Sequence, residues 1–297
     1  MTEQKYISLA LGTFDVFHLG HMAVINAAKQ SEYPMYALLF NEHPLKAIVG
    51  KAPPELLCDS VLFRLRDEYG IPAIHIDFGE IMDLSAEEFF YDILLDDMSV
   101  RELSCGENYS FGKGGKGDVA LLCELCKQND IKLNVVPTVM YKDEPISSTR
   151  IRLAIENGNV EDANAMLGRP FSFAQSVIHG ESRGHSLGFP TANQLLPESF
   201  VKPRRGVYAA MCRIDGKLYP AVTNYGIKPT VGGTKPVSET HIIGLEADLY
   251  SSFIEVQLLS FIRDEMKFPD LQRLKGAISE DCKTSLKIFA KHLENGR

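Results

Sequence analysis

The hydrophobic pattern of this 297-residue chain changes its period near residue 170, and this change constrains the fold more than any other feature. Before it, apolar runs typical of buried strands alternate with helical patterns, which indicates a doubly wound, mostly parallel α/β sheet of the Rossmann-like kind. We expect strands at 6–11, 35–40, 73–78, 102–105 and 133–136, and helices at 23–30, 60–69, 85–95 and 119–127.

After the change, short alternating runs are punctuated by Gly and Pro, which is typical of antiparallel sheets and barrels. These runs lie at 173–179, 206–214, 218–225, 240–245 and 252–259, and a helical pattern follows at 272–293. We therefore predict an α/β domain over 1–172 and an antiparallel β-barrel with a closing helix over 173–297.

Charge is distributed unevenly between the two halves. Residues 1–170 carry 15 Lys and Arg against 26 Asp and Glu, a net charge of −11, whereas residues 171–297 carry 16 against 13, a net charge of +3. Nucleic-acid binding needs a basic footprint, so the acidic half favours a small-molecule substrate. No apolar run approaches a membrane span and no signal peptide is evident, which predicts a cytoplasmic protein without membrane contact. The sequence leaves open whether the chain forms a weak homo-oligomer.

Six cysteines are too sparse for a disulfide framework. Cys123 and Cys126 form a CxxC, but the segment around them has an amphipathic helical pattern and no second pair of metal ligands. We interpret them as cysteines on a buried helix face.

The segment 12–21, GTFDVFHLGH, carries the sharpest chemical signal. Two histidines one helical turn apart, with a glycine between them, stand where a strand passes into a helix. The amides and dipole of such a helix attract phosphate, and His18 and His21 can donate hydrogen bonds to a phosphoryl group whose charge grows in the transition state. An ordinary strand-to-helix turn is the alternative. The pattern resembles the HxGH nucleotidyltransferase superfamily, whose members transfer a nucleotidyl group from a nucleoside triphosphate.

Two further segments of the first half favour phosphate or ligand binding. The loop 108–118 has four glycines within six residues, which permits close approach to a ligand but also suits a merely flexible loop. In 145–152, Ser147 or Ser148 can cap a helix whose first turn holds Thr149, Arg150 and Arg152. Arginine there opposes the helix dipole unless an anion is bound; an ordinary capped surface helix is the alternative.

The second half has two candidate chemical segments. In the loop 184–193, Thr191 and Asn193 can offer neutral oxygens to a Mg²⁺ ion that is also bound to ATP phosphates, although a turn with incidental polar residues has the same composition. Glu239 is expected at the start of a strand, and a carboxylate at such a strand edge can act as a general base toward a substrate hydroxyl. Taken alone, a solvated glutamate is the commoner case.

Together these motifs resemble the prokaryotic bifunctional riboflavin kinase/FAD synthetase family. The matching segments span nearly the whole chain: GTFDVFHLGH, FNEHPLKAI (40–48), LSAEEFF (84–90), CGENYSFGKGGKGD (105–118), ISSTRIR (146–152), LGRPF (167–171), GHSLGFPTAN (184–193), GVYAA (206–210), NYGIKPT (224–230), ETHIIG (239–244) and FIRDEMKFPDLQRLKGAI (261–278).

The resemblance implies a nucleotidyltransferase-like first domain and a six-stranded riboflavin kinase barrel. The barrel would phosphorylate riboflavin to FMN with Glu239 as catalytic base and with Mg-ATP held by Thr191 and Asn193. The first domain would transfer AMP from ATP to FMN, giving FAD and pyrophosphate, with His18 and His21 as its catalytic residues. The other positions that match the family's substrate- and nucleotide-binding segments are Gly12, Phe14, Asp15, Gly20, Asn108, Ser148, Thr149, Arg150, Gly188 and Pro190.

One departure from the family lies inside the first motif. Val16 and Phe17 follow Asp15, where the family usually has glycine, and a bulky pair there could narrow the phosphate site. Two alternatives therefore remain: a riboflavin kinase with a weak or inactive adenylyltransferase domain, and a non-catalytic regulator that binds flavin or nucleotide. The intact Glu239, Thr191 and Asn193 argue against the regulator.

Overall fold

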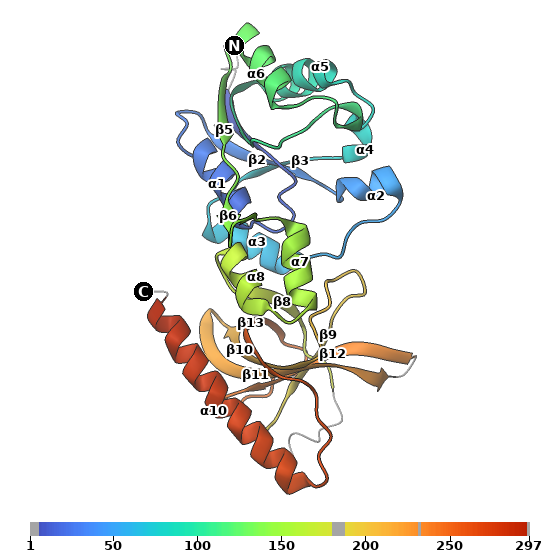
Figure 1. The fold of residues 1–297 in the computed structure, drawn as a ribbon, viewed down its shortest axis with the longest axis vertical. Helices are drawn as coiled ribbons and strands as arrows, with labels where there is room; N and C mark the ends of the chain where they lie inside the picture. Colours follow the sequence, from blue (N-terminus) through green and yellow to red (C-terminus); the bar gives the residue numbers. More distant parts are fainter. Residues whose placement is uncertain (1–5, 180–187, 231–232, 296–297) are drawn as a thin grey trace. The chain divides into compact units, whose positions relative to one another are not determined.

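The computed structural model describes residues 6–179, 188–230 and 233–295, and the chain forms two compact units (Figure 1). The first comprises Met1–Pro53 and Phe63–Ser148, and the second comprises Pro54–Leu62 and Thr149–Arg297. The predicted loop 184–193 lies partly outside the described residues, because its first four residues belong to the undescribed segment 180–187. The predicted division after residue 172 stays a prediction.

The first unit is built on the predicted parallel sheet. Its strands run in the order β3-β2-β1-β4-β5 and all pairs are parallel. All five residues of the central strand β1 are buried, which explains its unbroken apolar run. The strands are β1 (Ile7–Leu11), β2 (Met35–Phe40), β3 (Ala73–Ile76), β4 (Val100–Gly106) and β5 (Lys132–Val136). A short hairpin, β6 (Met140–Tyr141) with β7 (Glu144–Pro145), follows them.

Helical segments connect these strands. They are α1 (Leu19–Ala28), α2 (Pro44–Val49), α3 (Asp59–Glu68, which crosses the division between the units), α4 (Phe78–Ile81), α5 (Ala86–Glu88), the π-helix η1 (Phe89–Asp97), the 3-10 turn η2 (Lys113–Gly115) and α6 (Val119–Gln128). Cys126 on α6 is buried, and burial raises its pKa to about 12, so this thiol stays protonated as the helix-face interpretation requires.

The segment 85–95, expected to be a regular helix, is only partly α-helical. Ser85 and Glu88 form a capping box at the start of α5, but from Phe89 onward the turns widen into a π-helix. A π turn brings residues five apart onto one face, and both Phe89 and Leu94 are buried. Burial of these side chains in the core of the unit accounts for the difference from the expected helix.

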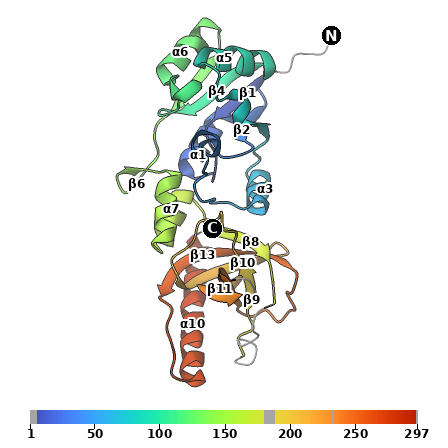
Figure 2. The same ribbon diagram turned by 90° about the vertical axis from the view of Figure 1, so that its right-hand side faces the viewer.

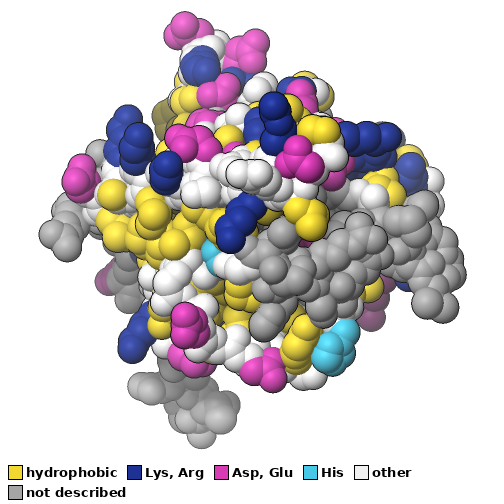
Figure 3. All heavy atoms as spheres, turned by 90° about the horizontal axis from the view of Figure 1, so that it is seen from below, with side chains coloured by type: hydrophobic (Ala, Val, Ile, Leu, Met, Phe, Trp, Pro, Cys, Tyr) yellow, Lys and Arg dark blue, Asp and Glu magenta, His cyan; other side chains and the backbone are white. Residues whose placement is uncertain are grey.

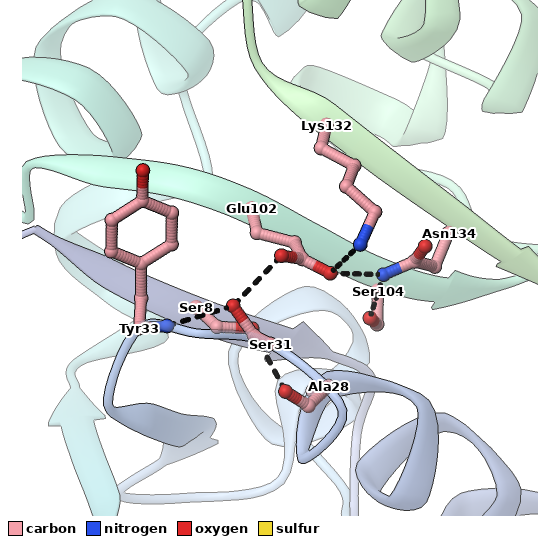
Figure 4. Close-up of polar contacts among 8 residues, drawn as sticks. All are labelled: Ser8, Ala28, Ser31, Tyr33, Glu102, Ser104, Lys132 and Asn134. Carbon is pink, nitrogen blue, oxygen red and sulfur yellow. Dashed lines mark hydrogen bonds and ion pairs between the residues drawn. The ribbon is translucent and has the colours of Figure 1, made fainter.

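A polar cluster lies where β4 and β5 begin, at the amino edge of the sheet (Figure 4). The buried carboxylate of Glu102 accepts hydrogen bonds from Ser31 (2.7 Å), Lys132 (2.8 Å) and Asn134 (2.7 Å). Burial by itself would raise the pKa of Glu102, but these bonds and the charge of Lys132 outweigh it, so that the pKa is lowered.

In its described residues, the second unit combines the helices α7 and α8, a six-stranded antiparallel sheet and a long final helix. The sheet order is β8-β13-β10-β11-β12-β9. A bridge between Ile178 and Asn193, and a bond from Gln194 to the carbonyl of Gln175 (2.8 Å), bring its two ends together into a near-barrel. The elements are α7 (Ser148–Glu156), α8 (Val160–Leu167), β8 (Phe171–Ser176), β9 (Ala192–Leu195), β10 (Gly206–Ile214), β11 (Lys217–Thr230), β12 (Gly233–Ile242), β13 (Phe253–Arg263) and α10 (Leu271–Asn295).

Helix α10 closes this unit as expected, lying against β10, β11 and β13 (Figures 1 and 2). Ile278 packs near Val207 and Val222, and Ile288 and Phe289 pack near Met211 and Leu259. Within the described residues, no helix combines the length and apolar character needed to cross a membrane.

The strand predicted at 240–245 is wrong in its bounds, and the predicted place of Glu239 is wrong with it. β12 already begins at Gly233, so Glu239 lies well inside the strand, and β12 is flanked by β11 and β9 rather than forming an edge. The glycine and proline of the segment 224–230 are typical of a loop, but β11 continues through it and pairs with β12, with Ile227 opposite Pro236. Tertiary pairing overrides the local signal here.

Candidate active sites

His18 closes the amino end of α1. Its backbone is extended, and its Nδ1 atom accepts a hydrogen bond from the backbone N–H of His21 at 3.1 Å. Because an accepting Nδ1 carries no proton, the proton of the neutral imidazole resides on Nε2. The helix cap therefore fixes His18 as an Nε2–H donor, next to amides that attract anions.

The glycine between the two histidines leaves room for this arrangement. The imidazole rings of His18 and His21 stack with centroids 3.7 Å apart and an interplanar angle of 15°. A Cβ atom on Gly20 would come within 3.0 Å of Cε1 of His18. The spacing of the motif thus has a steric origin, because the His18 ring folds back over the backbone of Gly20.

Val16 and Phe17, the departure from the family pattern, have fully buried side chains, each 0% exposed. Phe17 stacks on Phe14 at a centroid distance of 6.4 Å, and Phe14 meets the His21 ring edge-on at 5.2 Å. A Cβ atom on Gly12 would come within 3.0 Å of the Phe14 ring. Both side chains are therefore packed inside the unit, and Phe17 supports the Phe14 ring that lies beside His21.

Asp15 and Ser148 bring together two motifs that are far apart in the sequence. The hydroxyl of Ser148 donates to a carboxylate oxygen of Asp15 at 2.5 Å. Thr149 and Arg150, which follow Ser148, belong to the second unit, and their binding roles stay predictions. Arg152 is buried and its Nε donates to the carbonyl of Pro54 at 2.6 Å, so its position at the helix start has a structural explanation.

A cavity of about 350 Å³ lies beside the carboxyl ends of β1 and β2. Gly12 and Thr13 border it, and so does Asn108, whose amide donates to the Thr138 hydroxyl at 3.2 Å. Five of the fifteen residues that line it are aromatic. Burial raises the pKa of Tyr109 above its ordinary value, which keeps that hydroxyl neutral. The aromatic lining residues are Phe40, Phe78, Phe89, Tyr109 and Phe111.

Sequence reasoning did not single out Phe40, Phe78 or Phe89 as site residues. Two of them lie inside segments that match the family, 40–48 and 84–90, and Phe78 is the last residue of the strand predicted at 73–78. An aromatic residue at the carboxyl end of a predicted strand, as at Phe40 and Phe78, was the available signal, because ligands sit at the carboxyl ends of strands in parallel sheets.

In the second unit, strand register places three polar side chains in one row. Glu239 of β12 lies opposite Asn193 of β9 on one side and opposite Asn224 of β11 on the other. Directly opposite residues of antiparallel strands project from the same face of the sheet. The motifs 184–193, 224–230 and 239–244 therefore converge on one polar row, Asn193–Glu239–Asn224, although Asn224 was not among the predicted site residues.

Asn193 and Thr191 supply oxygen atoms at one end of this row. The buried Asn193 amide nitrogen donates to the carbonyl of Thr191 at 3.3 Å, which directs the amide oxygen away from this contact. A hard cation such as Mg²⁺ prefers oxygen ligands and is commonly held jointly by protein and substrate phosphates, so this donor set fits it. Among the described residues, no cluster of three His, Cys, Asp or Glu side chains could hold a metal by itself.

A cavity of about 720 Å³ opens beside the segment 188–191. Gly188, Pro190 and Thr191 line it, and Thr240 contributes from β12. Gly188 has a φ of +84°, which glycine adopts without strain. Glu239 and Asn193 do not line this cavity, because side chains alternate along a strand and their neighbours Thr240 and Ala192 face it instead.

Apolar surface accompanies the polar row. The carboxylate of Glu265 accepts a hydrogen bond from the Asn224 amide at 3.4 Å, and Met266, the next residue, is 61% exposed. Ile227 on β11 and Leu271 at the start of α10 are exposed as well. Apolar side chains are visible among charged ones in the space-filling view from below (Figure 3).

Comparison with known proteins matches both halves of the chain. A family model described as FAD synthetase matches residues 1–150, and one described as riboflavin kinase matches residues 167–289. The bifunctional riboflavin kinase/FMN adenylyltransferase of Haemophilus influenzae is 32% identical over 95% of this chain and 94% of its own length. The protein of the same description from Bacillus subtilis is 30% identical over 97% and 94%.

A solved structure from Streptococcus pneumoniae, described as a macrolide-efflux protein, has a similar overall fold. It is 30% identical, with a TM-score of 0.85 over 95% of this chain and 94% of that one. Two family models in order along one chain, together with relatives that match over nearly the whole length, identify the lineage. The chain belongs to the bifunctional riboflavin kinase/FMN adenylyltransferase family.

Proposed function

We propose that this chain carries out both reactions of its family, each at its own site. The second unit transfers the terminal phosphoryl group of ATP to a riboflavin hydroxyl, which gives FMN and ADP. The first unit transfers AMP from another ATP to the FMN phosphate, which gives FAD and pyrophosphate.

The polar row Asn193–Glu239–Asn224 is the observation that supports the kinase assignment most directly. Riboflavin offers a neutral hydroxyl, so phosphoryl transfer gains from a base that accepts its proton. Glu239 is the carboxylate of the row, held between two amide side chains by the register of β9, β12 and β11. We assign it as the catalytic base, with the flavin ring resting on the exposed apolar side chains near Asn224.

ATP binding is assigned to the segment 188–193. The cavity of about 720 Å³ is large enough for a nucleoside, and its lining residues Gly188, Pro190 and Thr191 lead along the chain to the polar row. Thr191 and Asn193 would hold Mg²⁺, which when bound neutralises charge on the phosphates. We place the nucleobase of ATP in the cavity, and the phosphates along the segment 188–193 toward the row on the other face of β9 and β12.

The adenylyl transfer needs charge stabilisation more than a base, because the FMN phosphate is already an anionic nucleophile. His18 donates from Nε2, and His21 lies stacked against it at the amino end of α1. The cavity of about 350 Å³ suits the flat isoalloxazine ring because aromatic side chains line it. The hydrogen bond from Ser148 to Asp15 supports the loop that leads from the cavity to His18.

Neither alternative reading receives specific support. The side chains of Val16 and Phe17 are buried, so a bound nucleotide would not touch them, and the departure from the family is no reason to expect a blocked site. A regulator without catalysis would not require a carboxylate aligned between two amides. Cytoplasmic location and weak self-association stay predictions.

The decisive experiment supplies the two acceptors separately. Purified protein with FMN, ATP and Mg²⁺ is expected to form FAD, and with riboflavin in place of FMN it is expected to form FMN first; chromatography resolves the flavins. FAD no greater than in a control without protein would overturn the first assignment. Persistent FMN formation in the riboflavin arm would then confine the failure to the first unit. Excess chelator should stop riboflavin phosphorylation if Mg²⁺ acts as proposed.

A further inference from the structure

The glycine-rich loop of the first unit rests directly on the start of α5. A Cβ atom on Gly112 would lie 2.6 Å from the backbone nitrogen of Ala86, and one on Gly117 would lie 2.8 Å from the Cβ atom of Ala86. Neither distance is compatible with a side chain. These two glycines are therefore explained by close packing on Ala86, and general flexibility of the loop is not needed to account for them.

Hydrogen bonds hold both partners of this contact. Ser85 and Glu88 cap α5 reciprocally, at 2.7 Å and 3.1 Å, which fixes the backbone on which the loop rests. The backbone N–H of Lys113 donates to the carbonyl of Leu84 at 2.6 Å. Within the loop, Phe111 and Gly117 exchange backbone hydrogen bonds of 3.0 Å and 2.9 Å, so the loop is closed upon itself.

The loop carries one wall of the aromatic cavity. Tyr109 and Phe111 stack with centroids 5.8 Å apart, and Phe111 lies 6.1 Å from Phe89, which follows α5. Ala86 is 6% exposed and does not line the cavity itself. Any influence of Ala86 on a ligand in this cavity is therefore indirect, through the loop that rests on it or through Phe89.

We propose that Ser85 and Ala86 are positioning residues for FMN adenylylation, because they form the platform that sets how closely Tyr109 and Phe111 approach the flavin ring. The inference rests on the proposed placement of FMN in this cavity. A larger side chain at position 86 lifts the loop, and loss of the Ser85 hydroxyl loosens the platform. Both changes weaken the binding of FMN and leave the phosphoryl chemistry at His18 and His21 intact.

The first test is A86V in the full chain, with A120V as the matched control, since Ala120 is exposed on α6. A86V is expected to raise KM for FMN about tenfold, with kcat and KM for ATP in the same reaction changed by less than about twofold. A fraction of unfolded A86V molecules would lower the apparent kcat and leave KM unchanged. A raised KM for FMN therefore distinguishes displacement of the loop from partial unfolding of the protein. The A120V variant is expected to keep wild-type KM values.

A second pair of variants keeps the inference testable if A86V does not fold. S85A removes the cap and is expected to raise KM for FMN about threefold, whereas S85T retains a capping hydroxyl and is expected to restore most of the affinity. An S85A protein with the wild-type KM for FMN, or an S85T protein as impaired as S85A, would contradict the proposed positioning role of Ser85.

A third variant, F78A, distinguishes failure of the platform from failure of the pocket assignment. Phe78 lines the cavity outside the loop, and its ring packs edge-on against Phe40 at a centroid distance of 5.4 Å. If F78A raises KM for FMN while A86V and S85A do not, FMN binds as proposed and only the platform is wrong. If F78A also leaves KM for FMN unchanged, the cavity is not the FMN site. The proposed placement of FMN and the positioning role of Ser85 and Ala86 are then both wrong.

Discussion

The two candidate sites are built in opposite ways. In the first unit, the two histidines that we propose to bind phosphate lie on ten consecutive residues that join a strand to a helix. In the second unit, the row that we propose to be catalytic is assembled from three strands whose residues are distant in sequence. The proposed acceptor substrates explain this difference. Transfer to an anionic phosphate needs electrostatic stabilisation, whereas transfer to a neutral hydroxyl needs a base held at one position.

The largest effect is expected from H21A, which tests whether the sites are separate. Removing a donor to the transferring phosphoryl group should lower FAD formation from FMN by about 10²- to 10³-fold. Riboflavin phosphorylation by the same protein should persist at the wild-type rate, as measured by flavin chromatography. H75A is the matched control, because His75 is exposed on β3. An equal loss of both activities would show that the two sites are not independent.

E239Q provides the reciprocal test in the second unit. The amide keeps the shape of the side chain but cannot take a proton, so riboflavin phosphorylation should fall by about 10²-fold or more, while FMN adenylylation stays unchanged. Steady-state rates with each flavin measure the two effects, and E280Q on the exposed face of α10 is the control. A wild-type phosphorylation rate in E239Q would remove Glu239 from the mechanism.

G20A sharpens the steric explanation of the first site. The new methyl group would meet the His18 ring at 3.0 Å, so the ring must shift by a few tenths of an ångström. Alanine also favours a helix relative to glycine, so stability should be kept or raised while kcat for FAD formation falls by about tenfold. Thermal unfolding measured beside kcat separates the two effects. Unchanged kcat would mean that the ring position does not matter.

The smallest effect is expected from K132M, which asks whether the polar cluster at the amino edge of the sheet bears on either site. The lowered pKa of Glu102 means that its contribution to stability is present above the ordinary carboxyl pKa of 4.5 and is lost as the pH falls through the folded value. Loss of Lys132 should therefore reduce protection of the β4 amides by about 1 kcal/mol at pH 7, a value kept low because the lysine side chain is 64% exposed.

Hydrogen exchange at pH 7 and near pH 4 checks this, with a smaller difference between wild type and K132M expected at the lower pH. Both enzymatic rates should stay at wild-type values, because Glu102 lies at the edge of the sheet opposite to the carboxyl ends that carry the site. A selective loss of FAD formation in K132M would link this cluster to the first site.

Local chemistry made much of the first site predictable. The helix after 12–21 was expected to start at 23 but begins at Leu19, because His18 provides a cap that periodicity does not detect. The aromatic wall of the cavity was not predicted, since Phe40, Phe78 and Phe89 come from three different segments. The π-helix after Phe89 was missed for a related reason: its widened turns suit the core, and no propensity scale encodes that.

The candidate site of the second unit was less predictable from the sequence. Glu239, Asn193 and Thr191 were identified by type and by resemblance, but the expected strand bounds put Glu239 at a strand start. Pairing between β11 and β12 extends through Gly and Pro and encloses Glu239 between two neighbouring strands. Asn224 became a candidate only through that pairing.

By itself, the sequence determined the change from α/β to antiparallel architecture and located the candidate phosphate-binding motif, because hydrophobic period and helix capping are set by residues close together in the chain. Only the tertiary structure decided that Asn193, Glu239 and Asn224 lie in one row, and that Gly112 and Gly117 pack directly against Ala86. Strand register and steric approach between elements depend on which distant segments pack together, and a one-residue slip in register would turn Glu239 to the other face of the sheet.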